Sequence, residues 1–166
     1  MITMIVALKE QSRIFLAADS LIRDGNDRYY NHQKIVQCEP NQVLMAGCGN
    51  DKIVQEFIHG FQFNATHPDI ETCSIYLNNL HKTFQSNYQN YYQFLIVGDG
   101  RIMHINSEGL VEECPHFQAI GEGREMALVG VELTEQLPPD VRTHSIFTAI
   151  EKHTNTVGGD TDVKFI

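Results

Sequence analysis

Four residues in the first third of the chain have side chains or backbone groups that could do chemistry together. They are Thr3, Asp19, Lys34 and Gly47, and each lies at the end or edge of a short apolar run. A threonine hydroxyl is a poor nucleophile until a nearby base takes its proton. A lysine and an aspartate can tune such a base, and a backbone N–H can stabilise an oxyanion. Taken singly, Thr3, Asp19 and Lys34 are each better explained as an ordinary surface or turn residue, so their order and spacing have to decide.

The apolar runs around these residues predict the strands that position them. Each run is short and bounded by polar turn residues, which is typical of strands buried on both faces. The runs are residues 4–8, 12–18, 34–36 and 42–46. Glu10-Gln11 is the expected first turn, and the polar segment 20–33 is expected to be a loop or a short hairpin. The fourth strand is expected to stop at Gly47-Cys48-Gly49.

These pieces, in this order, resemble a known family. The pattern is Thr-x-Ile-Val-Ala-Leu, then Leu-Ala-Ala-Asp-Ser, then Lys-Ile-Val, then Ala-Gly-x-Gly-x-Asp. It resembles the N-terminal half of proteasome β-type subunits and is similar to HslV, the bacterial ATP-dependent ring protease. Both are N-terminal-nucleophile (Ntn) hydrolases. The resemblance extends over essentially the whole chain, including the closing Gly-Gly-x-x-Asp-Val at 158–163. It implies an α+β fold, a four-layer αββα sandwich, with residues 1–166 forming one proteasome-like Ntn-hydrolase domain.

The same resemblance implies peptide-bond hydrolysis by an N-terminal threonine whose own α-amino group is the general base. An α-amino group has an unperturbed pKa near 8, which suits a base that works near neutral pH. Carried over to this chain, Thr3 is the nucleophile, Lys34 lowers the pKa of the base, Asp19 orients the lysine, and Gly47 supplies the oxyanion N–H.

The resemblance also implies a pocket for the substrate residue that precedes the cleaved bond. The expected lining residues are Ser20, His32, Val36, Met45 and Gly49. Met45 would form an apolar floor, and the glycine at position 49 would leave the pocket roomy.

Three departures from the family pattern leave the activity open. Met1 and Ile2 precede Thr3, so the threonine has to be exposed by processing before it can act as an N-terminal base. Glu122 stands where the family has a serine, between Gly121 and Gly123. The family's later aspartate and serine are replaced by the two residues Thr154 and Val157.

Two hypotheses therefore stand side by side, with a third behind them. The first is a threonine-type endopeptidase that acts once Thr3 is exposed. The second is a non-catalytic, degenerate ring or shell subunit that keeps the fold. The third is an amidase on the same fold.

The net charge and the cysteines indicate which partners and which compartment to expect. The formal net charge is −9 and no Lys/Arg cluster interrupts it, so nucleic acid and membranes are not expected partners. The four cysteines, at positions 38, 48, 73 and 114, have no metal-like spacing and are expected to be reduced thiols in a cytoplasmic protein. We expect no metal and no cofactor. The resemblance implies self-association into rings, a peptide or unfolded-protein substrate, and a possible ATP-dependent unfoldase as partner.

The rest of the chain predicts helices in pairs between groups of strands. Asn50 and Asp69 are expected to cap the first two helices. The Gly98-Asp99-Gly100 turn predicts a hairpin. The expected elements are helices over 51–61, from 69 to about 84, after Gly123 and over about 143–153, and strands over 94–105, 110–114, 117–120 and 161–166. Grouped strands and grouped helices predict packed layers and not alternating βαβ units.

Overall fold

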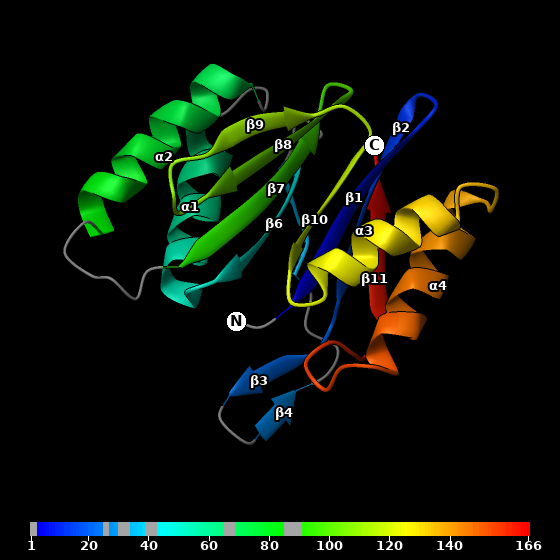
Figure 1. The fold of residues 1–166 in the computed structure, drawn as a ribbon. Helices are drawn as coiled ribbons and strands as arrows, with labels where there is room; N and C mark the ends of the chain where they lie inside the picture. Colours follow the sequence, from blue (N-terminus) through cyan, green and yellow to red (C-terminus); the bar gives the residue numbers. More distant parts are fainter. Residues whose placement is uncertain (1–2, 25–26, 30–33, 39–42, 65–68, 85–90) are drawn as a thin grey trace.

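The structure is a computed structural model that describes residues 3–24, 27–29, 34–38, 43–64, 69–84 and 91–166 of the 166-residue chain (Figure 1). Strands and helices alternate in groups, as the sequence predicts. Two larger antiparallel sheets and a separate two-stranded hairpin hold all the described strands.

The first sheet carries the start and the end of the chain. It has four strands in the order β10-β1-β2-β11, and every neighbouring pair is antiparallel. The strands are β1 (Met4–Glu10), β2 (Arg13–Asp19), β10 (Phe117–Gly121) and β11 (Thr161–Phe165). Strand β1 therefore lies between two partners, which is consistent with its apolar sequence.

The second sheet is formed by the middle of the chain. It has five strands in sequence order: β5 (Val36–Cys38), β6 (Val43–Gly49), β7 (Tyr92–Gly98), β8 (Arg101–Asn106) and β9 (Val111–Cys114). The small hairpin, β3 (Ile22–Asp24) and β4 (Asp27–Tyr29), lies outside both sheets (Figure 1).

Four helices cover the outer faces of the two sheets. Helices α1 (Asp51–Asn64) and α2 (Ile70–Phe84) lie on the five-stranded sheet, while α3 (Arg124–Leu133) and α4 (Pro139–Glu151) lie on the four-stranded sheet (Figure 1). The result is the expected αββα sandwich. None of the helices, over the residues described, is long and apolar enough to span a membrane.

Three apolar clusters fill the spaces between the layers. The middle cluster lies between the sheets and includes Ile5, Leu16, Leu44 and Leu95. Outer clusters lie beneath α1 and α2 and beneath α3 and α4. Because successive side chains of a strand point to opposite faces, a strand between two clusters must be apolar at nearly every position. This explains the continuous apolar runs of β1 and β2.

Several boundaries differ from the sequence expectation. Helix α4 begins at Pro139 and not near residue 143, because a proline fits the first turn of a helix, where its missing N–H is not needed. Strand β6 continues through Gly49, since its pairing with β7 extends to Tyr92. The expected caps are confirmed: Asn50 accepts from the Ile53 N–H at 3.3 Å and Asp69 from the Thr72 N–H at 2.6 Å.

Candidate active site

Strand pairing brings the start of β1 and the end of β2 to one end of the four-stranded sheet. In the observed registers, Met4 pairs with Gly121 of β10, and Asp19 pairs with Thr161 of β11. Thr3 directly precedes β1, and its carbonyl accepts a hydrogen bond from the Glu122 N–H at 2.9 Å. Four segments that are distant in the sequence therefore meet around Thr3.

Three of the four candidate catalytic residues form one buried cluster. The Thr3 hydroxyl donates to Oδ1 of Asp19 at 2.5 Å, and the Lys34 ammonium donates to the Thr3 hydroxyl oxygen. Lys34 Nζ also lies 2.9 Å from Asp19 Oδ1. Thr3 is fully buried, and both charged side chains are 1% exposed. The cluster thus holds a hydroxyl between an acid and an amine, away from water.

The hydrogen-bond donors of Lys34 are all used. Besides Thr3 and Asp19, Nζ donates to the carbonyl oxygen of Leu21 at 2.6 Å. An ammonium has three N–H donors, so this arrangement satisfies the charged form. Burial lowers the pKa of Lys34, and the Asp19 carboxylate opposes that shift without cancelling it. A lysine whose pKa is depressed can more readily exchange a proton with a neighbouring group.

Asp19 is held by main-chain groups as well as by Thr3 and Lys34. Its Oδ1 accepts from the Met4 N–H at 2.9 Å, and its Oδ2 accepts from the Gly158 N–H at 3.3 Å. Gly158 is in turn fixed by its carbonyl, which accepts from the Leu21 N–H at 3.0 Å. Multiple donors to one carboxylate fix its orientation.

Gly47 lies in β6, two residues after Met45, which pairs with Val36 of β5. Lys34 lies two residues before Val36, just ahead of β5. A side chain at Gly47 would not fit, because its Cβ would lie 2.6 Å from the Phe94 ring and 2.9 Å from Val54. The structure therefore brings the Gly47 backbone to the same end of the sandwich as the buried cluster.

The turn between β10 and α3 also depends on a glycine. Gly121 has φ +90°, and a Cβ there would lie 1.9 Å from the Thr3 carbonyl oxygen. Glu122 meets Thr3 through its backbone N–H, while its side chain is exposed. The Lys34 ammonium donates to Thr3, Asp19 and Leu21 and not to the Glu122 carboxylate.

The residues at the other two departures occupy different places. Val157 is buried in the cluster beneath α3 and α4. The Thr154 hydroxyl is buried, and it has no hydrogen-bond partner among the described residues. Neither side chain contacts Asp19 by a hydrogen bond in the described part of the chain, where the Gly158 N–H takes that role.

The expected substrate-pocket residues are spread over several environments. Ser20 is buried beside Asp19, and its hydroxyl has no partner among the described residues. Met45 is fully buried in the cluster beneath α1 and α2. Gly49 ends β6, with φ +111°, and Val36 packs at the edge of the same cluster. His32 lies outside the described residues.

Sequence reasoning missed two backbone contributors. The Leu21 carbonyl and the Gly158 N–H hold Lys34 and Asp19, respectively. The only sequence signal was the Gly158-Gly159 pair before the last strand.

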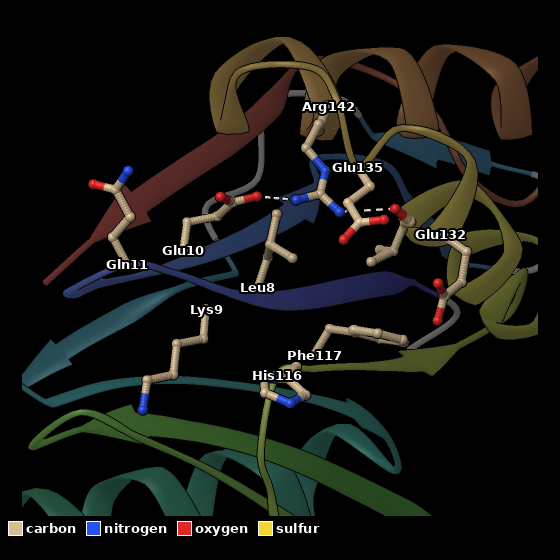
Figure 2. A pocket seen from close by; sticks show the side chains of 10 residues that line it. Leu8, Lys9, Glu10, Gln11, His116, Phe117, Glu132, Glu135 and Arg142 are labelled. Carbon is tan, nitrogen blue, oxygen red and sulfur yellow. Dashed lines mark hydrogen bonds and ion pairs between the residues drawn. The ribbon is translucent and has the colours of Figure 1, made fainter.

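The end of the sandwich opposite Thr3 has a separate hollow of about 480 Å³ (Figure 2). Leu8 and Val131 form part of its lining, and the turn between β1 and β2 borders it. The Arg142 guanidinium crosses it, donating to Glu10 and to the Val131 carbonyl, the latter at 2.7 Å. The charge of Arg142 is therefore already paired with that of Glu10.

Possible metal ligands and free cysteines were the other candidate reactive groups among the described residues. Over the described part of the chain, no group of three or more His, Cys, Asp or Glu could hold a metal ion. Cys48, Cys73 and Cys114 are buried free thiols. Burial raises the pKa of both Cys48 and Cys73 to about 12, which makes them poor nucleophiles.

Solved structures show the same arrangement of layers and strands over nearly the whole chain. Thiobacillus denitrificans BPH in complex with epoxomicin superposes with a TM-score of 0.80 at 18% identity, covering 98% of this chain and 97% of that chain. The chain has the Ntn-hydrolase fold. Eukaryotic HslV from Trypanosoma brucei gives a TM-score of 0.75 at 11% identity, with 98% of each chain covered. Anbu (ancestral beta-subunit) from Yersinia bercovieri gives 0.75 at 18% identity, covering 98% of this chain and 80% of that one. No family model and no curated protein sequence matches this chain.

Proposed function

We propose that this protein is a proteasome β/HslV-like subunit that hydrolyses peptide bonds through Thr3 once that residue becomes N-terminal. The observation that carries the proposal is the buried cluster in which the Thr3 hydroxyl lies between Asp19 and Lys34. A nucleophile within hydrogen-bond distance of an amine, with an acid orienting that amine, is the arrangement expected for an activated hydroxyl.

Each group has a defined role in the proposed reaction. The freed α-amino group of Thr3 takes the hydroxyl proton as Oγ1 attacks the peptide carbonyl carbon, and it later gives a proton to the leaving amine. The Lys34 ammonium favours the neutral, basic form of the α-amine by electrostatic repulsion. Asp19 holds Lys34 in place, and the Gly47 N–H stabilises the oxyanion. Water then hydrolyses the ester on Thr3 and regenerates the hydroxyl.

The proposal also covers the organisation of the protein. Residues 1–166 form one domain, and copies of the chain assemble into rings that enclose the Thr3 sites, with unfolded protein as the substrate. The likeness to the HslV and Anbu structures supports assembly of this kind.

The test compares two forms of the chain. One begins at Met1, and the other is released from a cleavable tag so that Thr3 is its first residue. Intact mass defines each N-terminus, and a panel of fluorogenic peptides measures hydrolysis. We expect activity only with Thr3 first, its loss in Thr3→Ala and Lys34→Ala, and partial retention in Thr3→Ser, which keeps a hydroxyl.

Epoxomicin, which is bound in the BPH structure, serves as an active-site probe. We expect it to inhibit the Thr3-first form and to leave Thr3→Ala without a binding signal. Hydrolysis that survives Thr3→Ala would remove Thr3 from the mechanism. A Thr3-first form that is folded but inactive toward all peptides and unresponsive to epoxomicin would favour the non-catalytic ring subunit.

A further inference from the structure

Strand β11 forms one edge of the four-stranded sheet, and among the described residues no strand lies on its outer side (Figure 1). Its sequence is Thr-Asp-Val-Lys-Phe, over Thr161–Phe165. No proline or glycine interrupts it, so nothing in the strand itself prevents a further strand from pairing there. Two of its apolar side chains are exposed, Val163 at 36% and Phe165 at 55%. An open edge of this kind is a template for another strand.

The pairing of β11 with β2 shows which backbone groups face the open edge. Ile14 and Ile166 exchange both of their N–H···O bonds, at 2.8 and 3.1 Å. In an antiparallel pair, hydrogen-bonded positions alternate with non-bonded ones. The register of β2 and β11 therefore directs the backbone groups of Lys164 and Asp162 towards β2. The backbone groups that face the open edge are those of Thr161, Val163 and Phe165.

Asp162 and Lys164 lie on the face of β11 that is turned towards the second sheet. Asp162 pairs with Ala18 and Lys164 with Leu16, and both partners belong to the middle cluster. Oδ2 of Asp162 is buried and has no hydrogen-bond partner among the described residues. Neither charged group forms an ion pair within the described part of the chain. A buried carboxylate oxygen without a donor is costly, so a cation supplied at this edge would stabilise Asp162.

Only one antiparallel register of two β11 strands pairs both charges with their opposites. When Val163 lies opposite the partner's Val163, Asp162 lies opposite the partner's Lys164, and Lys164 lies opposite the partner's Asp162. A shift by two residues places either two aspartates or two lysines opposite each other, which is unfavourable. A shift by one residue brings outward-facing backbone groups against positions that face away from them.

The same register satisfies the open backbone groups of both strands. Val163 exchanges two hydrogen bonds with the partner's Val163, while Thr161 and Phe165 bond to the partner's Phe165 and Thr161. The two charged pairs then occupy the non-hydrogen-bonded positions, where opposing Cα atoms are closest, at about 4.5 Å. On the outer face, the exposed Val163 and Phe165 side chains gain apolar neighbours across the contact. Charge, backbone direction and apolar exposure thus favour one arrangement.

We propose that β11 is a contact surface for a second copy of this chain, with the two β11 strands pairing antiparallel about a two-fold axis at Val163. The two four-stranded sheets then join into one continuous sheet across the contact. Each Asp162 carboxylate gains the ammonium of the partner's Lys164. This inference does not rest on the proposed peptidase function, and the contact joins two single chains or two rings equally well.

Charged side chains on an edge strand can also keep other strands away. A single lysine would oppose pairing of two copies in the centred register as well as in the shifted ones. In β11, however, Asp162 is two residues from Lys164, so the charges repel in the shifted registers and attract in the centred one. The signs of these two charges therefore distinguish a contact surface from a protected edge.

Charge reversal tests the proposed register directly. Asp162→Lys places lysines opposite lysines in the centred register, and Lys164→Asp places aspartates opposite aspartates. Light scattering after gel filtration gives the mass of each protein, from about 1 μM to about 1 mM, the range of weak to moderate association. We expect each single variant to have half the mass of the wild type, whether the wild type is a dimer of chains or of rings.

Mixing the two single variants supplies the decisive sample. Asp162→Lys and Lys164→Asp should bind each other, because lysines then face aspartates, and the mixture should regain the wild-type mass with both chains in the complex. The double variant Asp162→Lys/Lys164→Asp exchanges the charges and should also regain that mass. The matched control is Glu113→Lys on β9, an edge strand of the other sheet, which should keep the wild-type mass. Circular dichroism confirms that each variant is folded.

A cross-link tests the two-fold axis without changing any charge. In the proposed register, the Cα atoms of two copies of residue 163 are about 5.5 Å apart, which a disulfide can bridge. With oxidised glutathione as the oxidant, Val163→Cys should form a covalent dimer whose peptide map joins position 163 to itself, and the wild type should not form this link. A monomeric wild type over the whole range, single variants with the wild-type mass, or a mixture that stays at the lower mass would each overturn the proposal. No sample depends on peptidase activity, so an inactive protein with this contact would count against the proposed function alone.

Discussion

The buried pair of Asp19 and Lys34 leads to a quantitative prediction about stability. The two side chains are each 1% exposed, and their N–O distance is 2.9 Å, so solvent screens their attraction very little. Asp19→Asn keeps the side-chain shape but strands the Lys34 ammonium without its counter-charge. It also presents an NH₂ group where Oδ2 accepts from the Gly158 N–H. Breaking a buried pair in this way costs about 3–5 kcal/mol.

The second half of the prediction concerns the double variant. Lys34→Met alone leaves the Asp19 carboxylate with the Thr3, Met4 and Gly158 donors but without a cation. In Asp19→Asn/Lys34→Met no ammonium remains to be stranded, so the loss should fall short of the sum of the single losses. We expect a coupling energy of about 1–3 kcal/mol.

Urea unfolding at pH 7 measures all four free energies. At roughly 2–4 °C per kcal/mol for a chain of this length, Asp19→Asn should lower Tm by about 6–20 °C. The control cycle is Arg101→Met and Glu113→Gln, a surface pair whose side chains are 27% and 42% exposed at 3.0 Å. Its coupling should stay below about 1 kcal/mol. Additive losses at Asp19 and Lys34, or equal coupling in the two cycles, would refute the argument from burial.

Three further predictions concern single sites. Burial lowers the pKa of Lys34 in the folded protein below its ordinary value of 10.5, so between these two pKa values the unfolded chain binds more protons than the folded one. The free energy of unfolding of the wild type should therefore rise relative to that of Lys34→Met as the pH rises through this window. Urea midpoints of the wild type that fall relative to those of Lys34→Met would contradict this prediction. Gly47→Ala should lower the free energy of unfolding by about 1–3 kcal/mol, because the added Cβ would overlap the Phe94 ring. Gly60→Ala should instead raise it by about 0.5–1 kcal/mol, since the nearest atom to the added Cβ, on the Tyr76 ring, would lie 3.6 Å away. Burial raises the pKa of Cys73 to about 12, so iodoacetamide at pH 8 should label this thiol only as fast as the protein unfolds, which mass mapping over time will reveal.

The layers of the fold could be predicted because each leaves a local pattern in the sequence. Strands β1 and β2 are apolar at nearly every position since they lie between two packed clusters. Asn50 and Asp69 correctly predicted the starts of α1 and α2, because a capping residue bonds to N–H groups only a few residues further along the chain. The start of α4 was misplaced because a Pro-Pro pair is equally consistent with a break before a helix and with a proline in its first turn.

The candidate site could be predicted less completely, because its contacts are long-range. The residue types and order pointed to Thr3, Asp19 and Lys34, which the structure brings together over separations of 15 to 31 residues. The Gly158 N–H reaches Asp19 from 139 residues away. A backbone N–H carries no residue-specific signal, so the Gly158-Gly159 pair marked the segment without identifying its donor role.

Because these contacts come from the backbone, the three departures from the family pattern count less against activity than the sequence alone indicates. Glu122, Thr154 and Val157 replace polar side chains expected to support the site. Asp19 nevertheless receives hydrogen bonds from the Met4 and Gly158 N–H groups, and these do not depend on the side chains at the three positions. The Thr3 carbonyl is likewise held by the backbone N–H at position 122, whatever side chain stands there. What the proposed reaction still requires is a free α-amino group on Thr3, since that group takes the hydroxyl proton and an amide nitrogen is not basic enough to replace it. The exposure of Thr3, more than the identity of the three replaced side chains, should therefore decide between peptidase and inactive subunit.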